Sequence, residues 1–256
     1  MKFGLKYPLI YIFAKCLNSL SRSKRAEILI AIIRSSVKQF SPKETLRFLF
    51  ELENRLYLLE GKASVEYGKG IHTKHRHINY HRFFIENLNP GESVLDIGSG
   101  NGLMSYDMVT QVPGVSVVGI ELNEANIKFA RTHYQHPNLN FIHGDALKEL
   151  PNEKFDVVTL SNVLEHIEQR SLFLKRIVSE IKPIRLIIRI PFFERDWRVP
   201  LKKELKVDYH LDSSHFIEYT QEEFSEELKH AGLKGIHTEF RWGEIWSVVE
   251  SIQGGG

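Results

Sequence analysis

Residues 92–191 alternate short apolar runs with helix-like stretches, and this alternation limits the possible folds of the chain more than any other feature. The apolar runs end in turn-forming residues and occupy 93–98, 115–121, 140–145, 155–161 and 185–191. The helix-like stretches between them are 103–111, 123–135 and 163–181. Apolar strands separated by helices predict a parallel sheet that is covered on both faces. Right-handed crossovers bring the carboxyl ends of these strands, and so a ligand crevice, to one edge of a doubly wound α/β sheet.

A glycine-rich turn follows the first predicted strand. Gly98, Gly100 and Gly102 lie between this strand and the next helix, which allows a ligand to approach the backbone and the free N–H groups of the helix start. A dinucleotide site requires glycine or alanine at position 103, where this chain has Leu103. Asp96, just before the turn, is an anion that suits an ammonium group better than a phosphate. The pattern therefore disfavours a nicotinamide dinucleotide.

Three more polar positions follow predicted strands. Glu121 ends the second strand 23 residues after Gly98, where a carboxylate can accept hydrogen bonds from both hydroxyls of a ribose. Asp145 ends the third strand, where it could meet an adenine amino group. Ser161 and Asn162 end the fourth strand, near the expected reacting centre. The set predicts an adenosine-containing ligand along the carboxyl edge of the sheet.

The same run resembles the class I S-adenosylmethionine-dependent methyltransferases. It looks most like the quinone-type and small-molecule branch, through the segments LDIGSGNG, GIELNEANIKFAR, GDA and FDVVTLSNVLEHI within residues 92–190; the tail 218–233 is also similar. The resemblance implies a Rossmann-like, mostly parallel seven-stranded sheet and the cofactor S-adenosylmethionine, released as S-adenosylhomocysteine. It also implies which residues bind that cofactor: Asp96, Gly98, Gly100 and Gly102 at the methionine end, Glu121 at the ribose, Leu122, Asp145 and Ala146 at the adenine, and Ser161 and Asn162 beside the methyl group.

Transfer to a hydroxyl group needs positioning in line with the methyl group and usually a base that titrates near neutrality. Five of the twelve histidines are candidate bases: His75 and His77 before the first strand, His166 after the fourth, and His210 and His215 after the fifth. The alternative for each is a surface, capping or packing role. Glu165-His166 is similar to the E-x-x-E-H pattern with which small-RNA 2′-O-methyltransferases hold magnesium. Asn162 replaces the first glutamate of that pattern, so we expect no metal.

The thirty residues 191–220 form a long connection at the functional edge of the sheet, where we expect an acceptor lid. Arg195, Arg198, Lys202 and Lys203 could bind a phosphate or carboxylate, and Trp197 offers a stacking face. These residues predict O-methylation, or less readily N-methylation, of a small anionic acceptor that is sugar-like or phosphorylated. The alternatives are a quinone or lipid methyltransferase at a membrane surface, a cofactor-binding protein without catalysis, and a solvated insertion in place of the lid. Nothing after the fourth strand matches a nucleobase methyltransferase, so a nucleic-acid acceptor is not expected.

Residues 1–60 are predicted to form a basic helical extension of a methyltransferase domain at 61–256. Residues 1–47 contain ten Lys and Arg against two acids, a balance of about +8. Within them, the apolar stretch 7–14 could be an ordinary packed helix, an interfacial helix or a targeting signal; it is far shorter than the ~20 apolar residues that span a bilayer. A capping box at Ser41 and Glu44 predicts a helix that stops at Gly61.

Composition agrees with a globular protein. Hydrophobic residues make up 42 % of the 256 residues and charged residues 26 %, which excludes a disordered chain and a multi-span membrane protein. The single cysteine, Cys16, cannot form an internal disulfide and suits a reducing compartment. We therefore expect a cytoplasmic protein, with peripheral membrane contact through residues 1–40 as an open alternative. The sequence gives no prediction of oligomeric state.

Overall fold

The computed structural model describes residues 8–252, and it divides the chain into two compact units, Met1–Arg55 and Leu56–Gly256. The boundary falls inside the long helix α3 (Pro42–Tyr67), close to the boundary after residue 60 that the sequence predicts. Residues 1–7, at the start of the predicted helical extension, lie outside the described residues.

A single seven-stranded sheet forms the centre of the second unit, with the strand order β3-β2-β1-β4-β5-β7-β6. β1 to β5 pair parallel with their neighbours, and β7 pairs antiparallel with both β5 and β6, so six strands share one direction. The strands are β1 (Ser93–Ile97), β2 (Ser116–Glu121), β3 (Leu139–His143), β4 (Val157–Ser161), β5 (Arg185–Pro191), β6 (Leu233–Arg241) and β7 (Glu244–Ser251). This topology confirms the predicted doubly wound α/β fold.

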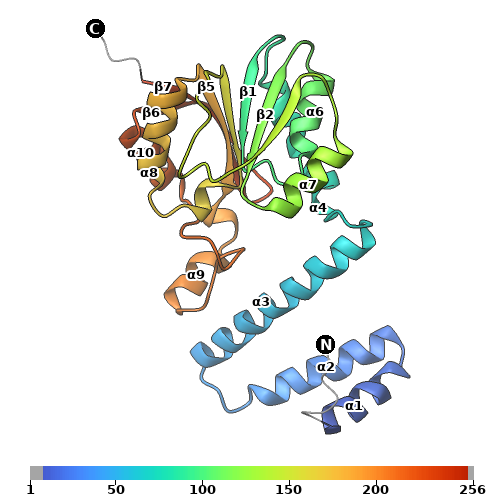
Figure 1. Ribbon diagram of the computed structural model, residues 1–256. Coiled ribbons are helices and arrows are strands. Elements are labelled where there is room, and N and C mark those ends of the chain that lie inside the picture. Colours follow the sequence, from blue (N-terminus) through green and yellow to red (C-terminus); the bar gives the residue numbers. More distant parts are fainter. Residues whose placement is uncertain (1–7, 253–256) are drawn as a thin grey trace. The chain divides into compact units, whose positions relative to one another are not determined.

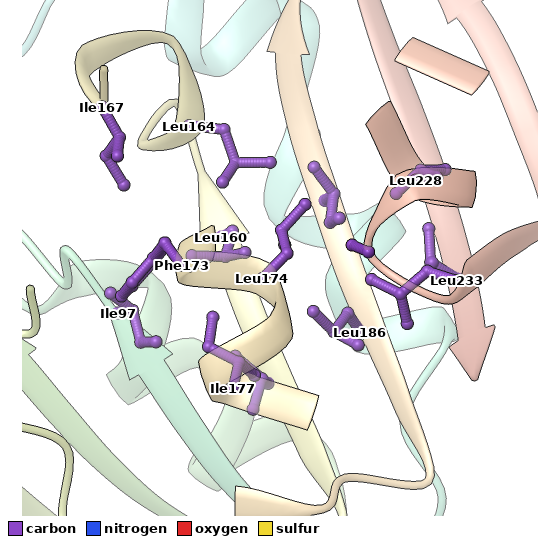
Figure 2. Close-up of a cluster of buried hydrophobic side chains, with 14 of the residues drawn as sticks. Ile97, Leu160, Leu164, Ile167, Phe173, Leu174, Ile177, Leu186, Leu228 and Leu233 are labelled. Atoms are coloured by element: carbon purple, nitrogen blue, oxygen red, sulfur yellow. The ribbon is translucent and has the colours of Figure 1, made fainter. Parts of the chain in front are cut away.

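Helices cover both faces of the sheet (Figure 1). One face carries α5 (Tyr80–Glu86), α6 (Leu103–Gln111) and α7 (Glu124–His133); the other carries α8 (Arg170–Arg176) and α10 (Gln221–His230). Because side chains alternate along a strand, Val94 faces the first set of helices while Leu95 and Ile97 face the second. Figure 2 shows the cluster on this second face, where side chains of β4, β5, α8 and α10 meet.

Two segments beyond β4 differ from the sequence prediction. The single helix expected over 163–181 is divided into a 3₁₀ turn (Leu164–His166), α8 and a π-helical turn (Ile177–Ile181). Ile167 causes the break, because its backbone is extended (φ −108°, ψ 126°) while its side chain packs in the core. The expected lid, 191–220, contains a 3₁₀ turn (Phe193–Arg195) and α9 (Arg198–Glu204). Asp196 Oδ1 accepts a hydrogen bond from the backbone N–H of Arg198 (2.9 Å) at the start of α9.

The first unit contains α1 (Pro8–Asn18), α2 (Arg22–Ser36) and the start of α3. The capping box is confirmed: Ser41 Oγ accepts from the N–H of Glu44 (3.3 Å), and Glu44 Oε2 accepts from the N–H of Ser41 (2.8 Å). The predicted stop at Gly61 is wrong, because a glycine inside a helix costs only about 1 kcal/mol and α3 continues to Tyr67. The chain leaves the helix through Gly70 at φ +99°, whose N–H is bonded to Val65 O (2.9 Å).

The apolar stretch 7–14 falls on α1, apart from residue 7, which is not described. None of the described residues of α1 or α2 is buried, and the three interpretations of this stretch, as a packed helix, an interfacial helix or a targeting signal, remain predictions. Two short helices and half of a third are too small to enclose a core of their own. Within residues 8–252, no helix has the length and apolar character needed to cross a bilayer.

Candidate active site

The glycine turn after β1 takes a backbone path that side chains rarely allow. Gly98, Gly100 and Gly102 all have positive φ (+70°, +56° and +85°). A Cβ atom at Gly98 would lie 2.6 Å from Val163 Cγ2, and one at Gly102 would lie 2.6 Å from Phe141 Cζ. A Cβ atom at Gly100 would meet nothing within 4 Å. Two of these glycines are therefore required by packing, and the middle one leaves its backbone open.

Gly119, in the middle of β2, is a further position that the sequence interpretation missed. A Cβ atom there would lie 2.9 Å from Ser99 Cβ and 2.8 Å from Phe141 Cδ1. The missing side chain lets the turn approach β2, where the N–H groups of Gly98 and Ser99 both donate to Ile120 O (2.8 and 3.1 Å). A glycine inside an otherwise β-branched run was the available signal.

A hollow of about 320 Å³ opens beside this turn, at the carboxyl ends of β1 and β4. Five of the predicted site residues line it, namely Gly98, Gly100, Ser161, Asn162 and His75. The remaining lining residues are Ile71, Lys74, Tyr80, His81, Ser99, Asn101, Leu103, Met104 and Arg189. The strand ends and the segment before β1 thus converge on one site, as the topology predicts.

Asp96 lies beneath the turn and is not among the residues that line the hollow. It is fully buried, and its two oxygens accept hydrogen bonds from Ser105 Oγ (2.5 Å) and Thr159 Oγ1 (2.8 Å). Burial raises the pKa of this carboxyl group to about 6, although both hydroxyl bonds act to lower it. In this position Asp96 connects β1, β4 and α6; its predicted contact with a cofactor remains a prediction.

The Asp96→Asn variant is expected to change how stability depends on pH. A carboxyl group whose pKa is raised by folding stabilises the fold fully below its unfolded pKa of about 4, and this contribution is lost as the pH rises through about 6. Asparagine keeps the shape and does not titrate. We therefore expect the unfolding free energy of the wild type, relative to the variant, to fall by roughly 3 kcal/mol between pH 4 and pH 7 in urea titrations.

Asp196→Asn serves as the control. Arg198 holds the pKa of the Asp196 carboxyl group at about 2, so in the folded protein this group does not titrate between pH 4 and pH 7. Parallel curves for wild type and Asp96→Asn would contradict the assignment.

Glu121 is the last residue of β2, and its side chain reaches the glycine turn after β1. Its Oε2 accepts from the N–H of Gly100 (3.0 Å) and its Oε1 accepts from the N–H of Asn123 (2.7 Å). Leu122 is 66 % exposed beside it. At the end of β3, Asp145 accepts from the N–H of Leu147 (3.0 Å) and pairs with Lys148, and Ala146 packs against the core. These four residues lie outside the lining of the 320 Å³ hollow, and their contacts with ribose and adenine remain predictions.

A buried ion pair, which the sequence interpretation missed, stands at the other side of the hollow. Arg189 on β5 forms two bonds to Glu244 on β7 (Nε–Oε2 2.6 Å, Nη2–Oε1 2.5 Å), and Trp246 Nε1 donates to the same carboxylate (2.9 Å). The guanidinium group also reaches Ser161 Oγ (3.2 Å) and lies 3.9 Å from the ring centroid of Tyr80. A charged residue inside the apolar run RLIIRIP was the signal. The pair places a fixed positive charge next to the end of β4.

The five candidate histidines fall into three groups: one lines the hollow, two lie outside it and apart from each other, and two lie together beside Glu165. His75 lines the hollow, and burial together with Lys74 and Arg189 lowers its pKa to about 4, so its imidazole is neutral at pH 7. His77 is exposed outside the hollow. His210 bonds to Asp208 Oδ1 (2.8 Å) and does not line the hollow either. The structure therefore brings only His75 of these three to the hollow.

His166 and His215, which are 49 positions apart, lie together next to Glu165. Their ring centroids are 4.7 Å apart. Glu165 is fully buried, neither of its oxygens has a hydrogen-bond partner, and burial raises its pKa to about 7. One ligand atom from each of the three residues lies within 4.8 Å of the others, so this is the group among residues 8–252 that could hold a metal ion. The sequence expectation of no metal remains a prediction.

The basic residues of 191–220 are engaged within their own segment. Arg195 pairs with Glu218 and donates to the carbonyls of Phe192 (3.0 Å) and Tyr209 (2.8 Å). Arg198 pairs with Asp196 (2.7 Å), and Lys203 lies 5.0 Å above the ring of Phe193. These contacts hold a connection of 30 residues in place. None of the four predicted acceptor residues Arg195, Arg198, Lys202 and Lys203 lines the hollow, and their binding of an anionic acceptor remains a prediction.

The model of a family described as a methyltransferase domain matches residues 88–232. Residues of this chain are 35 % identical over 97 residues to the ubiquinone biosynthesis O-methyltransferase of Pseudomonas fluorescens, a match that covers 36 % of this chain and 41 % of the relative. The mitochondrial ubiquinone biosynthesis O-methyltransferase of Schizosaccharomyces pombe is 35 % identical over 98 residues, covering 36 % of this chain and 35 % of the relative. The chain thus matches about two fifths of the length of these curated relatives.

A solved methyltransferase structure shares the fold of this chain. Magnesium protoporphyrin IX methyltransferase from Synechocystis, with bound S-adenosylhomocysteine, superposes with a TM-score of 0.54 at 18 % identity, covering 68 % of this chain and 81 % of that one. At this identity the likeness concerns the arrangement of strands and helices alone.

Proposed function

Because the chain belongs to the S-adenosylmethionine-dependent methyltransferases, we propose that it methylates a hydroxyl oxygen on the ring of a lipophilic, quinone-type acceptor. The observation that carries this acceptor class is the 35 % identity to ubiquinone biosynthesis O-methyltransferases from a bacterium and a yeast. The anionic, sugar-like acceptor has weaker support, since Arg195 and Arg198 are paired with Glu218 and Asp196 of their own segment. The proposal therefore follows the alternative that the sequence left open.

The residues at the turn fit S-adenosylmethionine. The missing side chain at Gly100 leaves open space above the backbone, and Ser99 Oγ and Asn162 Oδ1 are buried polar atoms without a hydrogen-bond partner. Glu121 offers carboxylate oxygens at the end of β2, where a ribose would lie. We assign the methionine end to Gly98, Gly100, Ser161 and Asn162, and the ribose and adenine to Glu121, Leu122, Asp145 and Ala146.

The bound cofactor supplies an electrophilic methyl group on a positively charged sulfur. The chain therefore has to position the acceptor oxygen and receive the proton of the acceptor hydroxyl. Arg189 stands beside Ser161, where its charge stabilises the oxygen as it becomes anionic. His166 and His215 lie together beside Glu165, after the end of β4 and outside the lining of the hollow, and we assign proton acceptance to this pair. In the proposed reaction the oxygen–methyl bond forms as the carbon–sulfur bond breaks, leaving S-adenosylhomocysteine.

Single alanine substitutions at the histidines test this assignment. We expect His166→Ala and His215→Ala each to lower kcat at least tenfold, because general-base catalysis typically contributes a hundredfold or more. His77→Ala and His210→Ala are matched controls, since neither histidine belongs to the cluster of Glu165, His166 and His215; they should stay within threefold. Activity should survive a chelator. Inactivation by EDTA that Mg²⁺ reverses would contradict proton acceptance and assign the cluster to a metal.

The acceptor class is tested by incubating the protein with methyl-labelled S-adenosylmethionine and two acceptors, a prenylated catechol and a sugar phosphate. We expect label in the organic phase only with the catechol. Label transferred to the sugar phosphate would overturn the proposed acceptor. Binding of S-adenosylhomocysteine in a calorimeter without transfer to either would favour a binding protein that has no catalysis.

A further inference from the structure

The first unit exposes many of its large apolar side chains. In α1, Leu9 is 80 % exposed and Ile12 58 %, and in α2 Leu29, Ile30 and Ile32 are each more than two fifths exposed. None of the described residues of either helix is buried. Soluble proteins seldom leave so much adjoining apolar surface uncovered unless it binds something.

The same helices and the residues beside them are strongly basic. Residues 8–38 contain six basic side chains against one acid, Glu27; the six are Lys15, Arg22, Lys24, Arg25, Arg34 and Lys38. Arg25 is committed to the turn between the helices, where its guanidinium donates to Leu20 O (2.8 Å) and Asn18 O (2.6 Å). The surface therefore combines apolar side chains with a net charge of about +5.

This charge selects among the partners that an apolar surface can have. A second copy of the chain would bring two positive surfaces together, which is unfavourable. A neutral apolar partner would leave the basic side chains without counter-charges. An anionic bilayer surface meets both requirements, because headgroup phosphates lie directly above an apolar layer.

We propose that α1 and α2 bind the surface of an anionic phospholipid bilayer. The apolar side chains of α1, including Tyr11 and Phe13, enter the boundary between headgroups and acyl chains, and the basic side chains remain among the phosphates. Neither helix is of a length to cross the membrane, so the unit lies on it. The benefit of this contact rests on the proposed function, because a lipophilic acceptor resides in the bilayer. The binding itself does not depend on that function.

Cys16 provides a site-specific reporter, because it is the single cysteine of the chain and lies exposed on α1. We expect a polarity-sensitive fluorophore on Cys16 of the full-length protein to shift to the blue with vesicles of phosphatidylglycerol and phosphatidylcholine. Vesicles of phosphatidylcholine alone should bind at least tenfold more weakly. As a control, the same fluorophore at Lys229→Cys in the Cys16→Ser background, on α10, should not shift.

Charge variants locate the contact. Lys24→Gln, Arg34→Gln and Lys38→Gln together should weaken vesicle binding roughly a hundredfold, since each basic residue near the surface contributes about fivefold. Lys175→Gln, Lys229→Gln and Lys234→Gln remove the same charge from exposed positions of the second unit and should change binding less than threefold. Replacing Ile10 and Phe13 with serine should abolish the fluorescence shift, even where the charges still hold the protein near the vesicle.

Several results would overturn the proposal. These are no shift with anionic vesicles, equal losses in both charge variants, or a stable dimer in sedimentation velocity that hides Cys16 and does not bind vesicles. The proposed function fails separately: if a prenylated catechol supplied in detergent is not methylated in the absence of vesicles while vesicle binding is intact, the acceptor is wrong and the membrane surface stands.

Discussion

Gly102→Ala is expected to lower the free energy of unfolding by about 2–5 kcal/mol and to abolish cofactor binding. Two effects add at this position. A side chain at φ +85° costs about 1–2 kcal/mol, and a Cβ atom 2.6 Å from Phe141 Cζ and 2.8 Å from Ala130 Cβ adds about 1–3 kcal/mol of overpacking. Because the turn is fixed against β3 and α7 at this point, relief of the clash displaces the turn. Urea unfolding and calorimetry with S-adenosylhomocysteine measure the two consequences.

Two other glycines separate these effects. Gly91→Ala, at φ +82° with nothing within 4 Å, carries only the backbone cost, so it should lose about 1–2 kcal/mol and bind normally. Gly100→Ala has the same freedom from clashes but places its methyl group beside the hollow. It should fold nearly as well as Gly91→Ala and bind at least tenfold more weakly. Normal binding by Gly100→Ala would contradict the placement of the ligand.

Glu244→Gln is expected to destabilise the protein by about 3–5 kcal/mol. The change keeps the size of the side chain and an acceptor for Trp246 Nε1, but it leaves the guanidinium group of Arg189, only 3 % exposed, without a counter-charge. Adding Arg189→Met removes the stranded charge and should restore most of the stability. The double variant should remain inactive, because it lacks the charge beside Ser161. Thermal and urea unfolding, with methyl-transfer assays, test both statements.

A second ion pair on the same strand is the control. Arg185 binds Glu92 (2.6 and 2.8 Å), but its guanidinium also donates to Asn87 O (2.7 and 3.2 Å). Glu92→Gln therefore leaves this arginine with acceptors, and we expect a loss below about 2 kcal/mol. Equal losses in Glu92→Gln and Glu244→Gln would show that the acceptors left to the arginine do not decide the cost.

The strands of the parallel part were predictable because their signal is local. The alternation of β-branched runs and helices places β1, β2 and β5 to within one residue, and the three glycines mark a turn that only positive φ explains. The charge of Arg189 inside an apolar run was visible in the sequence, but its pairing with Glu244 was not predictable, because β7 brings the two together across 55 positions by antiparallel pairing, which leaves no periodic signal. His166 and His215 meet for a similar reason. The basic residues of 191–220 attracted attention by composition, which does not reveal that Arg195 and Arg198 are each paired with an acid of the same segment.

The insertion of β7 between β5 and β6 has a consequence for vectorial synthesis of the chain. β5 is complete at residue 191, but the strand that covers its open edge begins at residue 244. Until that strand emerges from the ribosome, a nascent sheet exposes an apolar edge with an arginine that has no counter-ion, which is a template for pairing with another chain. Binding of a nascent chain by a chaperone should therefore end as β7 emerges, and fragments that stop before residue 244 should aggregate.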